Sequence, residues 1–129
     1  MHLEIGDDSG VVLHYTKKEQ PQTAGVILLG TGGMAPGHTP TFFETACSVD
    51  DPRPIHPFAF RTHTHSLGQV VSGWKISEDK NWSLIGKKSP KDPQMFYPVD
   101  DSSMTFTQGD ILAARCTMVR SIDILTFLL

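Results

Sequence analysis

Two histidines and an arginine in the stretch FAFRTHTH (residues 58–65) are the side chains most able to do chemistry. Side chains of an extended strand alternate between faces, so Arg61, His63 and His65 are expected to share one face. The Cα atoms of the two histidines would then lie about 6.6 Å apart, close enough for both imidazoles to bind one metal ion. Copper, zinc, iron and nickel all accept imidazole, and a third ligand normally decides among them. The spacing predicts a two-histidine metal site.

The guanidinium beside the histidines suggests a second role for the same face. Arg61 could bind a substrate carboxylate through two parallel hydrogen bonds. The alternative for both features is a solvated strand next to an ordinary surface arginine, since a His-x-His tripeptide often arises by chance. His56 is either a supporting group or a loop residue, and no role is assigned to the isolated His2, His14 and His38.

Composition excludes several classes of protein. The 129 residues fit a single domain, and a net charge of −3 gives no electrostatic reason to bind nucleic acid or an anionic membrane. No apolar run approaches the ~18 residues that a membrane span needs. The sequence holds neither a phosphate-binding P-loop nor a Gly-x-Ser-x-Gly nucleophile elbow. Its two cysteines, Cys47 and Cys116, permit at most one disulfide.

Frequent glycine and proline, without a helical period, predict an all-β fold of short strands packed as an antiparallel sandwich. Residues 58–76 form the longest β-like stretch, in which Phe58 and Phe60 are expected to pack inward. Polar residues 77–81 predict a hairpin turn into a strand at 82–85, and the three prolines within residues 50–57 predict irregular structure. The remaining strands are predicted at residues 11–15, 24–29, 41–49, 96–99, 104–107 and 111–118.

Three ordered sequence blocks carry a family resemblance. They are RTHTHSLGQVVSGW (residues 61–74), WSLIGK followed by FYPV (82–87 and 96–99), and GDILAARC (109–116). Together they resemble the second copper domain of the peptidylglycine alpha-hydroxylating monooxygenases, within the copper type II ascorbate-dependent monooxygenase family. The likeness extends over residues 10–119. Dopamine beta-hydroxylase shares the His-Thr-His core, but VVSG and AARC are more like the peptide enzymes.

The resemblance implies an oxidoreductase with a jelly-roll fold, in which His63, His65 and a methionine bind the copper that activates dioxygen. It also implies that Arg61 contacts the carboxylate of a glycine-extended peptide, whose glycine Cα is hydroxylated on the way to C-terminal amidation. In the family, ascorbate supplies electrons through a separate copper domain. The expected partners are the peptide and dioxygen, and the expected location is the secretory pathway or the extracellular space.

The sequence departs from the family beyond residue 119 and resembles a truncated form. Residues 1–119 are expected to form the copper domain and residues 120–129 a divergent apolar tail, which leaves the sandwich incomplete at its C-terminal edge. In the family, Cys47 and Cys116 pair with two downstream cysteines that are absent here, and none of the methionines present occupies the ligand position. The isolated chain is therefore expected to be inactive. The alternatives are a catalytically inactive copper- or peptide-binding fragment and a plain zinc-binding β domain.

Overall fold

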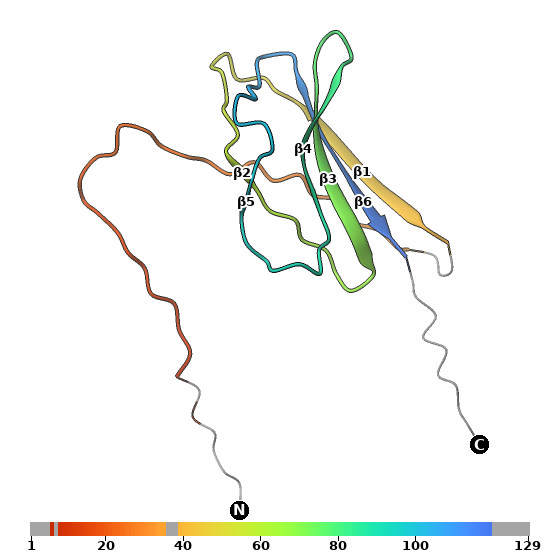
Figure 1. Ribbon diagram of the computed structural model, residues 1–129, viewed down its shortest axis with the longest axis horizontal. Coiled ribbons are helices and arrows are strands. Elements are labelled where there is room, and N and C mark those ends of the chain that lie inside the picture. Colours follow the sequence, from red (N-terminus) through yellow and green to blue (C-terminus); the bar gives the residue numbers. More distant parts are fainter. Residues whose placement is uncertain (1–5, 7, 36–38, 120–129) are drawn as a thin grey trace, which may run out of the picture.

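The computed structural model describes residue 6, residues 8–35 and residues 39–119, and these residues form an antiparallel all-β structure with no helix (Figure 1). One sheet has four strands in the order β1-β6-β3-β4, and a second sheet pairs β2 with β5. The predicted all-β class is therefore confirmed. The strands are β1 (Thr41–Ser48), β2 (Ala59–Phe60), β3 (Gly68–Ile76), β4 (Trp82–Lys88), β5 (Tyr97–Pro98) and β6 (Ile111–Met118).

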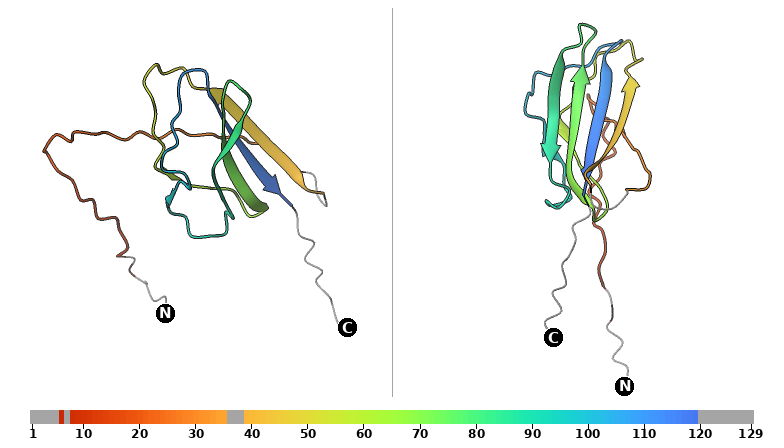
Figure 2. Two further views of the ribbon diagram at one scale, coloured as in Figure 1. Left: turned by 45° about the horizontal axis from the view of Figure 1, so that its top comes forward. Right: turned by 90° about the vertical axis from the view of Figure 1, so that its right-hand side faces the viewer.

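The hydrophobic core lies between the large sheet and the segments around β2 and β5. The four long strands run side by side, and the thinner β2 and β5 layer lies against one face of them (Figure 2). Ile85 of β4 and Leu112 of β6 enter the core from the large sheet, because alternate side chains of a strand point to one face. The buried cluster consists of Val49, Ile85, Val99, Met104, Phe106 and Leu112.

Several strands form where the pattern predicts them. Residues 41–48 and 111–118 pair along their full length as β1 and β6. The turn between β3 and β4 closes with a hydrogen bond from the Ser77 amide to the Asn81 carbonyl, at 3.0 Å, so the predicted hairpin is confirmed. The predicted strand at 104–107 is reduced to one bridge, in which Phe106 pairs with Ile55. None of the residues that the structure describes forms a helix long and apolar enough to cross a membrane.

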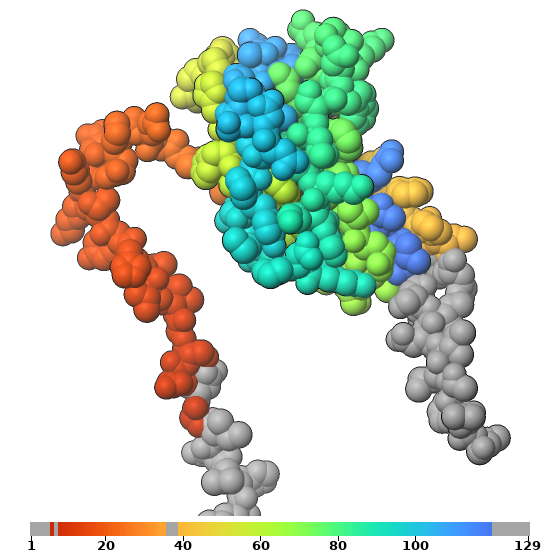
Figure 3. Space-filling model, in the orientation of Figure 1, coloured from red at the N-terminus to blue at the C-terminus, as the bar shows by residue number. Residues whose placement is uncertain are grey.

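The predicted strands at residues 11–15 and 24–29 are wrong. Residues 8–28 form an extended arm that leaves the body and pairs with no other strand in the described part of the chain (Figures 1 and 3). Val12 and Leu28 are 81% and 86% exposed, whereas Leu29 packs against the core. High β propensity does not by itself make a strand, because backbone N–H and C=O groups need a paired neighbour. The arm supplies suitable residues but lacks that neighbour.

The long β-like stretch at 58–76 is also interrupted, contrary to a single-strand interpretation. It forms β2, then residues 61–67 without ladder pairing, and then β3. Phe60 packs against the core as expected, but Phe58 is 70% exposed, so the expectation that both rings pack inward is wrong for Phe58. The interruption has a physical cause, since a turn from His65 to Gly68 (amide to carbonyl, 2.9 Å) redirects the chain from the small sheet to the large one.

Candidate metal centre

The candidate site lies on residues 61–65, between β2 in the small sheet and β3 in the large sheet. Although these residues belong to no ladder, they keep a strand-like alternation of burial. Thr62 is only 8% exposed and faces the interior, whereas Arg61, His63 and His65 are exposed. The expected common orientation of these three side chains therefore agrees with the burial pattern, because the alternation requires extended backbone and not hydrogen-bonded pairing.

The two histidine rings lie close together. Their centroids are 5.8 Å apart and their planes are inclined by 72°. A ligating imidazole nitrogen lies about 2 Å from its metal, so two rings can share one ion when their centroids are within roughly 6.5 Å. The distance between the His63 and His65 rings therefore allows both to bind one metal ion. The assignment of these residues as ligands stays a prediction.

A residue that the sequence pattern did not reveal joins the arginine to the first histidine. The side-chain oxygen of Gln94, Oε1, lies 3.2 Å from His63 Nδ1 and 3.4 Å from Arg61 Nη2. The Gln94 amide nitrogen in turn donates to the carbonyl of Pro90 at 3.1 Å. Gln94 is 31 residues from His63, in the proline-rich loop before β5, so no local spacing could have predicted the contact. Its position two residues before the FYPV block was the one available signal.

Two glycines let the surrounding chain close tightly around this segment. A Cβ at Gly68 would collide with the Thr64 side chain, between the two histidines, and would approach Pro90 Cγ to 3.0 Å. A Cβ at Gly86 of β4 would collide with the ring of Phe60, directly before Arg61. The segment is therefore held from both ends by contacts that leave no room for a side chain at positions 68 and 86.

The aromatic residues beneath the site tie the Gln94 loop to β2. The Phe60 and Tyr97 rings contact each other in a tilted arrangement, with centroids 6.1 Å apart and planes inclined by 35°. Tyr97 donates its hydroxyl hydrogen to the Pro93 carbonyl at 2.9 Å, and the Lys88 ammonium lies 4.5 Å from the centre of the Tyr97 ring. These contacts position the loop that carries Gln94 against β2, which ends directly before Arg61.

Other potential ligands lie elsewhere in the described residues. No three His, Cys, Asp or Glu side chains gather at one point within residues 8–35 and 39–119. His56 contacts the Thr105 hydroxyl at 3.1 Å, and Met104 is buried in the core. His2 and His38 lie outside the described residues. The fit is therefore to a metal held by two imidazoles, with its remaining positions open to other donors.

The cysteines are both free thiols in the structure. Cys47 on β1 is exposed, whereas Cys116 on β6 is buried. Burial disfavours the thiolate and raises the pKa of the Cys116 thiol. No disulfide joins residues of the described part of the chain.

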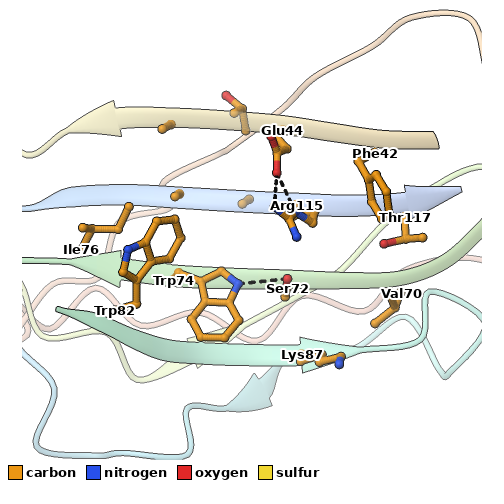
Figure 4. Close-up of a pocket in the computed structure, with 14 residues that line it drawn as sticks. Phe42, Glu44, Val70, Ser72, Trp74, Ile76, Trp82, Lys87, Arg115 and Thr117 are labelled. Carbon is orange, nitrogen blue, oxygen red and sulfur yellow. Dashed lines mark hydrogen bonds and ion pairs between the residues drawn. The ribbon is translucent and has the colours of Figure 1, made fainter. Parts of the chain in front are cut away.

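The outer face of the large sheet carries a separate groove. Trp74 and Trp82 meet edge to face with centroids 6.1 Å apart, and the Trp74 indole donates to the Ser72 hydroxyl (Figure 4). An exposed ion pair between Arg115 and Glu44 crosses from β6 to β1. None of the residues around the two histidines lines this groove, so it is distinct from the candidate metal centre.

Two neighbouring imidazoles on one exposed segment make this all-β protein a candidate metal-binding domain. Comparison with known families is more specific. Residues 22–124 match the model of the copper type II ascorbate-dependent monooxygenase C-terminal domain. The chain therefore belongs to the copper type II ascorbate-dependent monooxygenase family, and it corresponds to the C-terminal copper domain.

Individual relatives agree with this assignment. The chain is 46% identical over 112 residues to peptidyl-glycine alpha-amidating monooxygenase A of Xenopus laevis, and 44% identical over 112 residues to the peptidyl-glycine alpha-amidating monooxygenase of Mus musculus. Each match covers 85% of this chain but only 12% and 11% of the relative. Human dopamine beta-hydroxylase is 29% identical over 124 residues, which cover 86% of this chain and 20% of that enzyme. The chain thus spans about an eighth of the amidating enzymes that it resembles.

Proposed function

We propose that the chain binds one copper ion through His63 and His65 and contributes the catalytic copper domain of an enzyme that hydroxylates the Cα of a C-terminal glycine in peptides. The observation that carries this proposal is the 5.8 Å pairing of the two imidazoles, in a chain that is 46% identical over 112 residues to an amidating monooxygenase. Residues 1–119 are proposed as this domain and residues 120–129 as a divergent tail.

Arg61 is proposed to hold the peptide carboxylate. Its guanidinium is exposed and is joined to His63 through Gln94, so a carboxylate bound there would place the terminal glycine beside the histidine pair. Guanidinium and carboxylate match in a two-hydrogen-bond geometry, which fixes the orientation as well as the position of the ligand. Orientation matters because only one Cα–H bond is to be oxidised.

Copper held by His63 and His65 would supply the redox chemistry for dioxygen activation. The overall reaction balances with ascorbate as donor of two electrons and two protons, since one oxygen atom enters the Cα–H bond and the other leaves as water. Gln94 contacts both Arg61 and His63, and so keeps the carboxylate site next to the imidazole donors. The proposed partners are a glycine-extended peptide and dioxygen, and the proposed location is the secretory pathway or the extracellular space.

Peptide binding tests the substrate part of this proposal. A fluorescent tripeptide ending in glycine should bind the copper-loaded chain about tenfold more tightly than the same tripeptide with an amidated C-terminus, since a charge-assisted hydrogen bond to the carboxylate contributes about 1.5–3 kcal/mol and the site is exposed. Arg61→Ala should remove that preference, whereas Arg53→Ala, on another exposed arginine, should retain it. Equal affinity of the parent for both peptides would contradict the role of Arg61.

A catalytically inactive copper- or peptide-binding fragment is the second candidate. It is favoured by the absence, in the described residues, of a third His, Cys, Asp or Glu beside the histidine pair. Incubation of the copper-loaded chain with the tripeptide, ascorbate and air distinguishes the two. A gain of one oxygen atom in the peptide, measured by mass spectrometry, would support the enzyme, whereas binding without this gain would support the inactive fragment.

A further inference from the structure

Gln94 occupies a position that neither the sequence pattern nor the family comparison assigns. We propose that Gln94 is a positioning residue, which holds the proton of His63 on Nδ1, leaves Nε2 free to bind a metal, and links His63 to Arg61. This proposal rests on the proposed copper function for its consequences, although the hydrogen bonds that support it are independent of that function.

The orientation of the Gln94 amide follows from its three neighbours. Its nitrogen donates to the Pro90 carbonyl at 3.1 Å, and its oxygen faces both Arg61 Nη2 and His63 Nδ1. The reversed amide would place two acceptors together at Pro90 and two donors together at Arg61, because a guanidinium has no acceptor and a carbonyl no donor. Only one orientation therefore satisfies all three groups.

The amide orientation determines the tautomer of His63. Since Gln94 Oε1 can only accept, the His63 nitrogen that lies 3.2 Å away must donate, and the proton of the neutral ring resides on Nδ1. The lone pair of the neutral imidazole is then on Nε2. Metal-binding histidines are commonly fixed in this way, because the ring nitrogen that does not bind the metal donates to an acceptor. Removal of that acceptor typically lowers the metal affinity 10–100-fold.

The two histidines differ in this respect. In the described part of the chain the His65 ring has no hydrogen-bond partner and contacts the His63 ring edge to face. His63 is therefore the pre-oriented donor, whereas His65 must be ordered when a ligand binds. Ordering a free side chain opposes binding, so the fixed ring is expected to contribute more to affinity.

Gln94 carries no charge, and this affects its second neighbour, Arg61. As an uncharged acceptor it can orient Arg61 without cancelling the positive charge that a peptide carboxylate needs. A glutamate at this position would still accept from His63 Nδ1 but would form an ion pair with Arg61. The structure therefore assigns two separable roles to one side chain, one toward the metal ligand and one toward the arginine.

Two substitutions separate these roles. Gln94→Leu removes the acceptor, and we expect the affinity for Cu(II) to fall about tenfold, at the lower end of the usual range because the site is exposed. Gln94→Glu keeps the acceptor, so copper affinity should be retained while the preference for a free peptide carboxylate over its amide is lost. Gln108→Leu serves as the control, because this exposed glutamine precedes β6 and lies near Ser77 and Glu78, at the opposite end of β3 from Gly68.

The tautomer provides a readout that needs no metal. Long-range ¹H–¹⁵N spectra of the metal-free chain should show His63 with its proton on Nδ1, and Gln94→Leu should give a mixture of both tautomers. A parent protein whose His63 carries its proton on Nε2 would overturn the proposal, as would Gln94→Leu binding copper as tightly as the parent. If the parent binds no copper at all, the proposed function fails, and the tautomer measurement alone still decides the role of Gln94.

Discussion

Gly68 provides a stringent test of how the histidine segment is packed, because this first residue of β3 packs against Thr64, the residue between the two histidines. An alanine Cβ at this position would stand 2.7 Å from Thr64 Cβ and 3.0 Å from Pro90 Cγ, and it would collide with the Thr64 hydroxyl. Rotation of Thr64 can move the hydroxyl but not its Cβ. Gly68→Ala must therefore displace the backbone of residues 63–65 or the Gln94 loop.

The expected cost is that of overpacking a close-packed site, about 1–3 kcal/mol in the free energy of unfolding. With a denaturant slope of about 2 kcal/mol per molar urea, a loss of about 2 kcal/mol lowers the unfolding midpoint by about 1 M. The displacement of Thr64 also moves His63 and His65 relative to each other, so the affinity for copper should fall about tenfold or more. Both changes are measurable on the same preparation, by urea unfolding and by copper titration.

Gly73 supplies a matched control in the same strand. An alanine Cβ there would lie 3.8 Å from Ile85 Cδ1, an ordinary van der Waals distance, with no closer contact. Gly73→Ala should leave the midpoint unchanged or raise it slightly, since alanine restricts the unfolded chain. Equal midpoints and equal copper affinities for the two variants would refute the inference that Gly68 packs against the metal-binding segment.

Two further predictions concern the core and the thiols. Asp110 is 3% exposed and accepts hydrogen bonds from the Thr107 amide at 2.7 Å and from Lys75 at 3.0 Å. Asp110→Ala should therefore cost about 3 kcal/mol in urea unfolding, because it leaves the Lys75 ammonium with the Thr105 carbonyl but without its carboxylate partner. Asp100→Ala on the exposed loop should cost less than about 0.5 kcal/mol. Burial raises the pKa of Asp110, but the hydrogen bonds from Thr107 and the charge of Lys75 outweigh it, so the pKa lies below its ordinary 3.8. The contribution of Asp110 to stability should therefore persist above pH 4 and be lost only in more acidic solution. A contribution that disappears between pH 7 and 5 would contradict this. Cys47 should react with a thiol reagent at neutral pH well before Cys116, whose burial raises its pKa, and equal rates in the folded chain would contradict the burial of Cys116.

The parts of the fold that could be predicted from the sequence are those governed by local pattern. Alternation and turn residues located β6 to the residue and the β3–β4 hairpin closely, because both depend on neighbours in the chain. The arm at residues 8–28 has residues of equally high β propensity. Whether they form a strand depends on a partner strand beside them, and local sequence does not determine this.

The same distinction applies to the candidate site. The alternation of residues 61–65 placed Arg61, His63 and His65 on one side, and the burial of Thr62 agrees with it. Gln94 was missed because its contact with His63 depends on how the loop before β5 folds onto β2, through Tyr97 and Pro93. Long-range polar contacts of this kind follow from tertiary packing and leave no periodic signal in the sequence.

The proposed two-histidine copper site is tested most directly by titrating the metal-free chain with Cu(II) and following the bound ion by calorimetry and electron paramagnetic resonance. The parent should take up one equivalent, His63→Ala and His65→Ala should each abolish stoichiometric binding, and His56→Ala, which changes a histidine that contacts Thr105, should bind as the parent does. Nitrogen coupling in the spectrum should indicate two imidazole donors in the parent. A His63→Ala/His65→Ala double variant that still binds one copper as tightly as the parent would contradict the site.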